Sequence, residues 1–242
     1  MNNDTIVNVQ NLKRAFKFGE TTIWALNGVN MEIKRGEFAV VLGPSGAGKT
    51  TLLNMIGGID RPTEGKVIVD GEEITQYNNV QLNTYRRLAV GWVFQFFNVV
   101  ASLRAWENVG LALEFQGIKD QREIKKRSYE ILEKVGLKGK EERFPSQLSG
   151  GEQQRVAIAR ALVKKPKIVC ADEPTGNLDY VTGNSVAQLM RKLNEEEKIT
   201  FIIVTHDLNI TQFADRVFHL KMGKIEKIQE QPKIKMAPTE GE

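Results

Sequence analysis

Three short apolar runs along the chain are separated by polar turns and by stretches with a longer period. Residues 38–42, 168–171 and 201–204 are almost continuously apolar, which is typical of strands in a parallel sheet covered on both faces. Between the second and third runs, apolar residues recur at helical spacing, at Val186, Leu189, Met190 and Leu193. A helix there would be the crossover that two parallel strands require. The pattern therefore predicts an α/β core.

Two regions depart from this rhythm. Residues 67–74 place Asp70-Gly71 between apolar pieces, which predicts a tight hairpin and an antiparallel β lobe beside the core. From about residue 97 to 163 the apolar residues follow helical spacing, and two helices are expected, one ending at Gly136 and one before Pro166. Their apolar positions are Ile124, Ile131, Leu132 and Val135 in the first, and Val156, Ala159 and Val163 in the second.

We expect one domain over residues 1–242, because α/β domains of this length commonly stay undivided. Within it, the nucleotide-binding core and the β lobe should occupy about residues 1–96 and 164–228, and the helical lobe about residues 97–163. Residues 229–242 are polar, rich in Pro, Lys and Glu, and without periodicity. This composition predicts a flexible tail.

Composition narrows the class of protein only slightly. Hydrophobic residues make up 41% of the chain and charged residues 26%, which is the balance of a globular protein and argues against disorder. The net charge of +4 is spread along the chain and identifies no partner. A single cysteine, Cys170, excludes an internal disulfide, and no apolar run is long enough to span a bilayer. We therefore expect a cytoplasmic protein that reaches the membrane through a partner.

Residues 43–50 match the phosphate-binding pattern G-x-x-x-x-G-K-[ST], between a predicted strand and a predicted helix. In this setting backbone N–H groups surround a phosphate, Lys49 supplies a cation to the β and γ oxygens, and the Thr50 hydroxyl binds Mg²⁺. An ordinary glycine turn would not need this spacing. The predicted nucleotide contacts are Gly43, Pro44, Ser45, Gly46, Ala47, Gly48, Lys49, Thr50 and Thr51.

Two carboxylates, Asp172 and Glu173, stand at the exit of the apolar run 168–171. Beside a phosphate loop this position is typical of a Mg²⁺ site, and we assign the metal to Asp172. Glu173 would then orient and deprotonate the attacking water as a general base. The alternative is that both are simply solvated charges at a strand end. The phosphate loop in the same chain makes this alternative less favoured.

A second anion site is expected where Leu148-Ser149-Gly150-Gly151 leads into a helix, because helix N-termini attract phosphate. The sequence L-S-G-G-x-Q resembles the signature of ABC ATPases, and the order of all motifs is similar to theirs. The resemblance implies that ATP also contacts a set of signature residues: Ser149, Gly150, Gly151 and Gln154.

The ABC resemblance covers about residues 7–228 and implies a P-loop NTPase (RecA-like) core with an antiparallel β subdomain and an inserted α-helical subdomain. It also implies a homodimer that forms head to tail with ATP, in which the signature of one copy covers the γ-phosphate bound by the other. ATP and Mg²⁺ are the implied cofactors.

Three further residues are similar to family elements by position. Gln95 resembles the loop glutamine that touches Mg²⁺ and the water, and that links to the membrane partner. His206 resembles the switch histidine that contacts the γ-phosphate, and Asp179, in Gly176-Asn177-Leu178-Asp179, resembles the carboxylate that communicates across the dimer. His219 has no such context and is interpreted as structural.

Adenine needs an aromatic face on which to stack. The family usually provides an aromatic residue shortly after the first strand, and Phe16 matches that position best. Phe18 and Trp24 are nearby aromatics, and packing in the core is the competing interpretation for Phe16.

Three segments resemble the sequences of the macrolide-export and lipoprotein-release subfamily: Arg86-Arg87, residues 93–98 and residues 171–179. The implied function is to power transport or extraction of a drug, peptide or lipoprotein through a separate transmembrane permease, contacted near residues 95–113. We expect a groove for that partner at Phe96, Phe97, Leu103 and Trp106; the alternative is that these side chains form the core of the helical lobe.

Other functions remain as alternatives at this point. An ABC ATPase that regulates a cell-division or envelope-signalling membrane partner would have the same architecture. ABC ATPases that act on DNA or ribosomes normally carry a long coiled coil, zinc fingers or a second cassette, none of which the sequence contains, so no nucleic-acid partner is expected. An ordinary P-loop kinase or GTPase would have no use for the signature.

Overall fold

A computed structural model describes residues 4–232 of the chain. Its strands are β1 (Thr5–Phe18), β2 (Thr21–Lys34), β3 (Phe38–Leu42), β4 (Glu64–Val69), β5 (Glu72–Glu73), β6 (Val90–Phe94), β7 (Ile168–Asp172), β8 (Thr200–Thr205), β9 (Arg216–Lys221) and β10 (Lys224–Glu230). Its α-helices are α1 (Lys49–Ile56), α2 (Asn79–Ala89), α3 (Ala105–Phe115), α4 (Gln121–Lys134), α5 (Gly150–Leu162) and α6 (Tyr180–Glu197).

The larger sheet has six strands in the order β10-β9-β3-β8-β7-β6. From β9 to β6 neighbouring strands are parallel, and only β10 pairs antiparallel, as a hairpin with β9. The three apolar runs of the sequence are β3, β7 and β8 in the centre of this sheet, and all but one of their residues are buried. The prediction of a covered parallel sheet is therefore confirmed.

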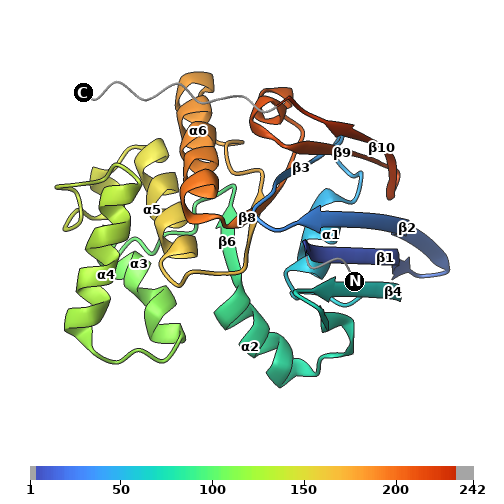
Figure 1. The fold of residues 1–242 in the computed structure, drawn as a ribbon, viewed down its shortest axis with the longest axis horizontal. Helices are drawn as coiled ribbons and strands as arrows, with labels where there is room; N and C mark the ends of the chain where they lie inside the picture. Colours follow the sequence, from blue (N-terminus) through green and yellow to red (C-terminus); the bar gives the residue numbers. More distant parts are fainter. Residues whose placement is uncertain (1–3, 233–242) are drawn as a thin grey trace.

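Successive residues of β3 belong to two different cores, which shows that both faces of the sheet are covered. Phe38 and Val40 pack with residues of α3 to α6, whereas Ala39 and Val41 pack with α1 and the antiparallel strands. Figure 1 shows this arrangement, with α3, α4 and α5 at one end of the molecule and β1, β2 and β4 at the other.

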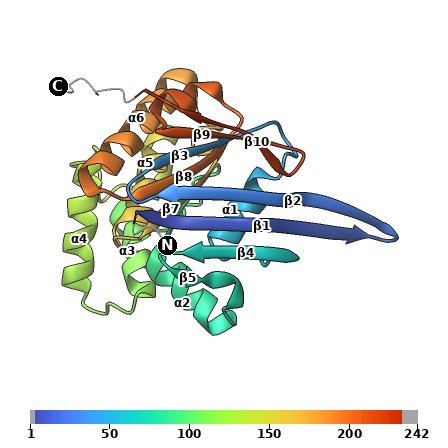
Figure 2. The same ribbon diagram turned by 45° about the vertical axis from the view of Figure 1, so that its right-hand side comes forward.

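The smaller sheet is antiparallel, in the order β2-β1-β4-β5. The predicted hairpin is confirmed: Val69 pairs with Glu72 across a turn in which Asp70 and Gly71 both have positive φ, 53° and 84°, as a type I′ turn requires. Strands β1 and β2 are 14 residues each and form a long ribbon beside β4 (Figure 2). The sequence pattern did not predict this length, because several register shifts interrupt the alternation.

The predicted helices of the intervening region are present as α4 and α5. Helix α4 ends in a turn closed by Gly136, which has a φ of 78° and donates its N–H to the Glu133 carbonyl. The predicted fold class, a P-loop core with an antiparallel β part and a helical part, is confirmed. Strand β10 continues to Glu230, two residues into the expected tail; residues 233–242 of that tail lie outside the described residues.

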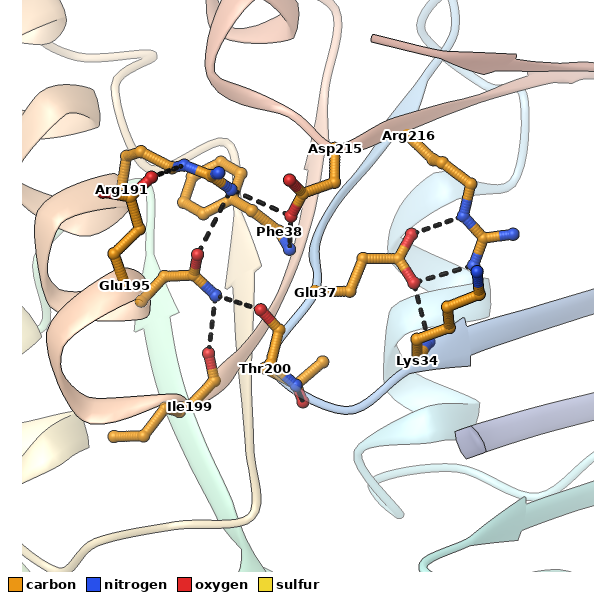
Figure 3. Close-up of polar contacts among 11 residues, drawn as sticks. Lys34, Glu37, Phe38, Arg191, Glu195, Ile199, Thr200, Asp215 and Arg216 are labelled. Atoms are coloured by element: carbon orange, nitrogen blue, oxygen red, sulfur yellow. Dashed lines mark hydrogen bonds and ion pairs between the residues drawn. The ribbon is translucent and has the colours of Figure 1, made fainter. Parts of the chain in front are cut away.

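A polar network surrounds the first residue of β3, at the end of the sheet where the parallel strands begin (Figure 3). Glu37, only 6% exposed, accepts hydrogen bonds from Arg216 Nε at 2.6 Å and Arg216 Nη2 at 2.7 Å, and from the Lys34 N–H at 2.6 Å. On the other side of β3, Asp215 accepts from the Phe38 N–H and from Arg191 of α6, both at 2.8 Å. The network ties β3 to β9 and to α6.

Candidate functional site

The phosphate loop lies between β3 and α1, as the sequence predicted. Helix α1 begins at Lys49, and its N-cap is Gly48, with a φ of 100°. The Lys49 side chain is 8% exposed, and its ammonium donates to the Gly43 carbonyl at 2.8 Å and the Pro44 carbonyl at 3.1 Å. The cation therefore lies within the curve of the loop, next to a helix N-terminus that favours anions.

Gly48 should tolerate no side chain. A Cβ at this position would lie 2.3 Å from the Ala25 carbonyl oxygen, in addition to the strain of its positive φ. We expect Gly48→Ala to lower the free energy of unfolding by at least about 3 kcal/mol, measured by thermal unfolding without nucleotide. Gly46 is the matched control: its φ is 76°, but a Cβ there would meet nothing within 4 Å. Gly46→Ala should cost only about 1–2 kcal/mol, and equal losses for both variants would contradict the steric argument.

The parallel strands bring the other polar groups to the same edge. In the register of the sheet, Phe94 lies beside Asp172, and Asp172 beside Val204. Side chains at or just after these strand ends therefore meet above the sheet, in the crevice where α/β proteins bind ligands.

Asp172 is positioned against the phosphate loop. Its Oδ1 accepts a hydrogen bond from the Thr50 hydroxyl at 3.1 Å. Burial raises the pKa of the Asp172 carboxyl, with the neighbouring Glu173 charge contributing in the same direction. An adjacent carboxylate and hydroxyl form a donor set that suits Mg²⁺, which takes oxygen ligands and leaves positions for water and phosphate. Among the described residues, no group of three or more His, Cys, Asp or Glu could hold a metal ion.

Glu173 is held in one orientation by several donors. Its Oε2 accepts from the Thr205 hydroxyl at 2.9 Å and the His206 N–H at 3.3 Å, and its Oε1 lies 2.9 Å from His206 Nδ1. The Lys49 ammonium is 3.5 Å from the same Oε1. Glu173 also has a φ of 46°, a left-handed conformation that is costly for a non-glycine residue and that concentrates at functional sites.

These residues surround one open cavity of about 650 Å³. Apart from Ala25, every residue that lines it was predicted from the sequence to belong to the site. The lining residues are Ala25, Pro44, Ser45, Gly46, Gly48, Lys49, Thr50, Thr51, Gln95, Asp172, Glu173 and His206. Gly43 lines an adjacent pocket with His219. The Gln95 amide donates to Asn177 Oδ1 at 3.2 Å, so β6 and the segment after β7 are joined at the cavity.

The role of Thr205 and the contact between Gln95 and Asn177 were not predicted from the sequence pattern. Thr205 is 1% exposed, and its hydroxyl both donates to Glu173 and accepts from the Asp207 N–H at 3.0 Å. The only available signal was its place at the end of an apolar run, beside His206. A threonine at a strand end has no distinctive pattern, so its role depends on the folded structure.

The signature residues lie at the start of α5, and none of them is among the residues that line this cavity. Ser149 is the N-cap of α5 and is exposed; it forms a reciprocal capping box with Glu152, with hydrogen bonds of 2.8 Å and 3.3 Å. Gln154 is fully buried instead, and its amide donates to the Phe94 carbonyl at 3.2 Å and the Pro174 carbonyl at 2.5 Å.

Two other predicted residues also lie away from the cavity lining. Asp179 is the N-cap of α6 and accepts from the N–H groups of Val181 and Thr182 at 3.1 and 3.0 Å. Its hydrogen bonds with Thr182 lower the pKa of the Asp179 carboxyl. Phe16 is half-buried on β1, with the Arg14 guanidinium 4.8 Å from the centre of its ring.

No α-helix within residues 4–232 has both the length and the apolar character needed to cross a membrane. The curated relatives nevertheless include membrane-transport components. The ABC transporter ATP-binding protein MJ0796 of Methanocaldococcus jannaschii is 46% identical, over 92% of this chain and 96% of its own length. The lipoprotein-releasing system ATP-binding protein LolD of Chromohalobacter salexigens is 41% identical, over 93% and 94%. The macrolide export ATP-binding/permease protein MacB of Mannheimia succiniciproducens is 43% identical, and this chain spans 34% of its length.

Solved structures agree with these relatives. A dimeric post-hydrolysis state of the MJ0796 cassette, bound to ADP and Pi, has a TM-score of 0.86 and 44% identity, and covers 95% of this chain and 100% of that one. Residues 26–176 match the family described as "ABC transporter". With the phosphate loop, the acidic pair and the signature all in place, the chain belongs to the ABC transporter family as an ATP-binding cassette, and it is similar to the lipoprotein-release and macrolide-export members.

Proposed function

We propose that this chain hydrolyses ATP to drive a separate membrane-spanning partner, at the cytoplasmic face of the membrane. The observation that carries the proposal is the position of Glu173: its carboxylate lies 3.5 Å from the phosphate-loop Lys49 ammonium and is fixed by Thr205 and His206. A general base must be oriented beside the reacting phosphate, and this arrangement meets that requirement.

In the proposed reaction Lys49 and the N–H groups around it bind the β- and γ-phosphates, and Glu173 takes a proton from the water that attacks the γ-phosphate. His206 holds the Glu173 carboxylate in position and contacts the γ-phosphate. Thr50, Gln95 and Asp172 would hold Mg²⁺, whose charge, when bound, stabilises the developing charge on the phosphate oxygens. Phe16 is proposed to stack on adenine.

The position of the signature supports a homodimer. Ser149 is exposed at the N-terminus of a 13-residue helix, where an anion is favoured, yet the described residues lining the cavity include no signature residue. A phosphate cradle that does not face the nucleotide of its own chain fits the nucleotide of a second copy. We therefore propose two composite sites, each closed by Ser149, Gly150 and Gly151 of the partner copy.

The proposed dimer can be tested with two variants: one that binds ATP without hydrolysing it, and one that in addition carries an altered signature. Glu173→Gln should bind Mg·ATP and accumulate as a dimer, measured by size-exclusion chromatography with light scattering. Adding Gly150→Asp should keep that protein monomeric, because a carboxylate would face the partner's γ-phosphate. The fold should tolerate this change, since a Cβ on Gly150 meets its nearest neighbour at 3.4 Å and acidic residues favour helix N-termini.

Gln121→Asp in the Glu173→Gln background is the matched control, because Gln121 is the first residue of α4 as Gly150 is of α5. This control should dimerise normally. A Glu173→Gln protein that binds ATP and stays monomeric would refute the composite site. The same conclusion would follow if the Gly150→Asp addition dimerised as well as the control.

The membrane partner is proposed to seat near residues 95–113. Phe96, directly after the cavity residue Gln95, is 74% exposed, and Val100, four residues further along the chain, is 41% exposed. Trp106 is half-buried against the helical core. Large apolar side chains exposed together mark interaction sites. Because the similar proteins LolD and MacB are described for lipoprotein release and macrolide export, we propose transport or extraction of a drug, peptide or lipoprotein.

A further inference from the structure

The backbone turn that follows Gln95 is strained. Phe97 and Asn98 both have left-handed φ angles, 58° and 51°, although neither is glycine. Asparagine adopts this region more readily than other residues, but a bulky aromatic residue there is an outlier. Two consecutive residues in this conformation persist only where the surrounding structure holds them.

Arg160 holds these two residues in this conformation. It lies on α5, the helix that begins with the signature glycines. Its Nη1 donates to the Asn98 carbonyl at 2.6 Å, and its Nη2 donates to the Phe97 carbonyl at 2.9 Å. No carboxylate pairs with it among residues 4–232, and burial lowers the pKa of its guanidinium. Arg160 is half-buried, and removing part of an arginine from water without a counter-charge is costly. Its two fork-like hydrogen bonds to consecutive carbonyls offset that cost.

Helix α5 also contacts the chain on the N-terminal side of Gln95. Gln154 donates to the Phe94 carbonyl, one residue before Gln95. The Phe97 ring lies near Gly150 at the start of the helix, where a Cβ on that glycine would be 3.6 Å from its Cζ. The same helix therefore contacts residues 94, 97 and 98 and also presents the signature at its N-terminus.

We propose that Arg160 is a positioning residue that locks the turn at residues 96–98 onto the signature helix, so that a push on exposed Phe96 moves Gln95 and the signature together. This inference rests on the proposed function, because it gives the motion of the turn a role in hydrolysis. The lock, meaning the restraint of residues 96–98 by the two Arg160 hydrogen bonds, is present in a single chain. Its effect on the mobility of the turn can be measured without assaying ATP hydrolysis.

The first measurement is the mobility of a spin label at position 96. The chain has one native cysteine, Cys170, which is fully buried, so Phe96→Cys provides a single labelling site on an exposed side chain. In this background Arg160→Met should make the label clearly more mobile. Arg155→Met is the matched control: Arg155 is also on α5 and donates to the Val135 carbonyl and the Ser185 hydroxyl, away from the turn. It should leave the label unchanged.

The second measurement is steady-state ATP hydrolysis without the label. Arg160→Met should lower kcat about 10- to 100-fold, because a small displacement of a positioning group has effects of this size. The KM for ATP should change less than about twofold, since the phosphate loop is untouched. Arg160→Lys should restore part of kcat: Lys164 already shows that one ammonium can hold two consecutive carbonyls, those of Arg86 and Arg87, at 2.9 and 3.1 Å.

The two measurements distinguish a failure of the proposed role of Arg160 from a failure of the proposed ATPase function. If the label is equally restrained in wild type and Arg160→Met, Arg160 does not lock the turn and the inference is overturned. If the label is released but kcat is unchanged, or falls equally in Arg155→Met, the lock does not serve hydrolysis and the inference is also overturned. If even wild type fails to hydrolyse ATP, the proposed function fails, while the label still reports whether the lock exists.

Discussion

Replacing Glu173 with glutamine is expected to lower the rate of ATP hydrolysis by about 10²- to 10⁴-fold. Glutamine keeps the shape of the side chain and can accept the Thr205 hydrogen bond, but it cannot take a proton from water at neutral pH. ATP binding should persist, because Lys49 and the loop N–H groups are unchanged and one negative charge near the phosphates is removed. The measurement is single-turnover phosphate release at saturating Mg·ATP.

Two further variants test why the loss occurs. Glu196→Gln removes a carboxylate with a 53% exposed side chain on α6, and it should hydrolyse ATP normally. Thr205→Val removes the hydroxyl that orients Glu173 and should cost about tenfold, the effect of losing one hydrogen bond of about 1.4 kcal/mol. Hydrolysis by Glu173→Gln within about threefold of wild type would show that another group is the base.

Arg216→Met is expected to destabilise the fold by about 3–5 kcal/mol, the effect of leaving one buried charge without its partner. Glu37 is 6% exposed and receives both Arg216 hydrogen bonds at the start of β3 (Figure 3). Without the guanidinium, its carboxylate would keep the Lys34 N–H but no counter-charge. The midpoint of urea unfolding, without nucleotide, measures the loss.

The comparison that makes this prediction specific is a double variant. Arg216→Met with Glu37→Met removes both charges and should recover to within about 1–2 kcal/mol of wild type, since the lost hydrogen bonds that remain are those of the Lys34 N–H and the Glu32 carbonyl. Lys192→Met breaks an exposed pair with Glu196, 3.9 Å apart, and should change stability by less than about 0.5 kcal/mol. If the double variant were less stable than Arg216→Met, the loss would not come from an uncompensated charge on Glu37.

Much of the site was predictable because its signals are local. The spacing from Gly43 to Thr50 and the pair Asp172-Glu173 after an apolar run are contiguous in the chain. Their meeting was also predictable, since parallel strands end at one edge and the structure places Thr50 and Asp172 in hydrogen-bond contact. The signature was recognisable from its resemblance to that of ABC ATPases, and its place before a predicted helix indicated an anion site.

The side chains that hold these motifs in place can be identified only in the folded chain. Thr205, Arg160 and Gln154 act on carboxylates or carbonyls that lie from 20 to 63 residues away in the chain, and no local pattern marks such partners. Gln154 shows the difference clearly: as part of a motif it was assigned to ATP, whereas in the fold it is fully buried against the Phe94 and Pro174 carbonyls. The fold class and the chemical groups of the site were predictable from the amino-acid order alone, because periodicity and motif spacing are properties of neighbouring residues. The orientation of those groups depends on hydrogen bonds between distant segments, which exist only once the sheet and helices have packed.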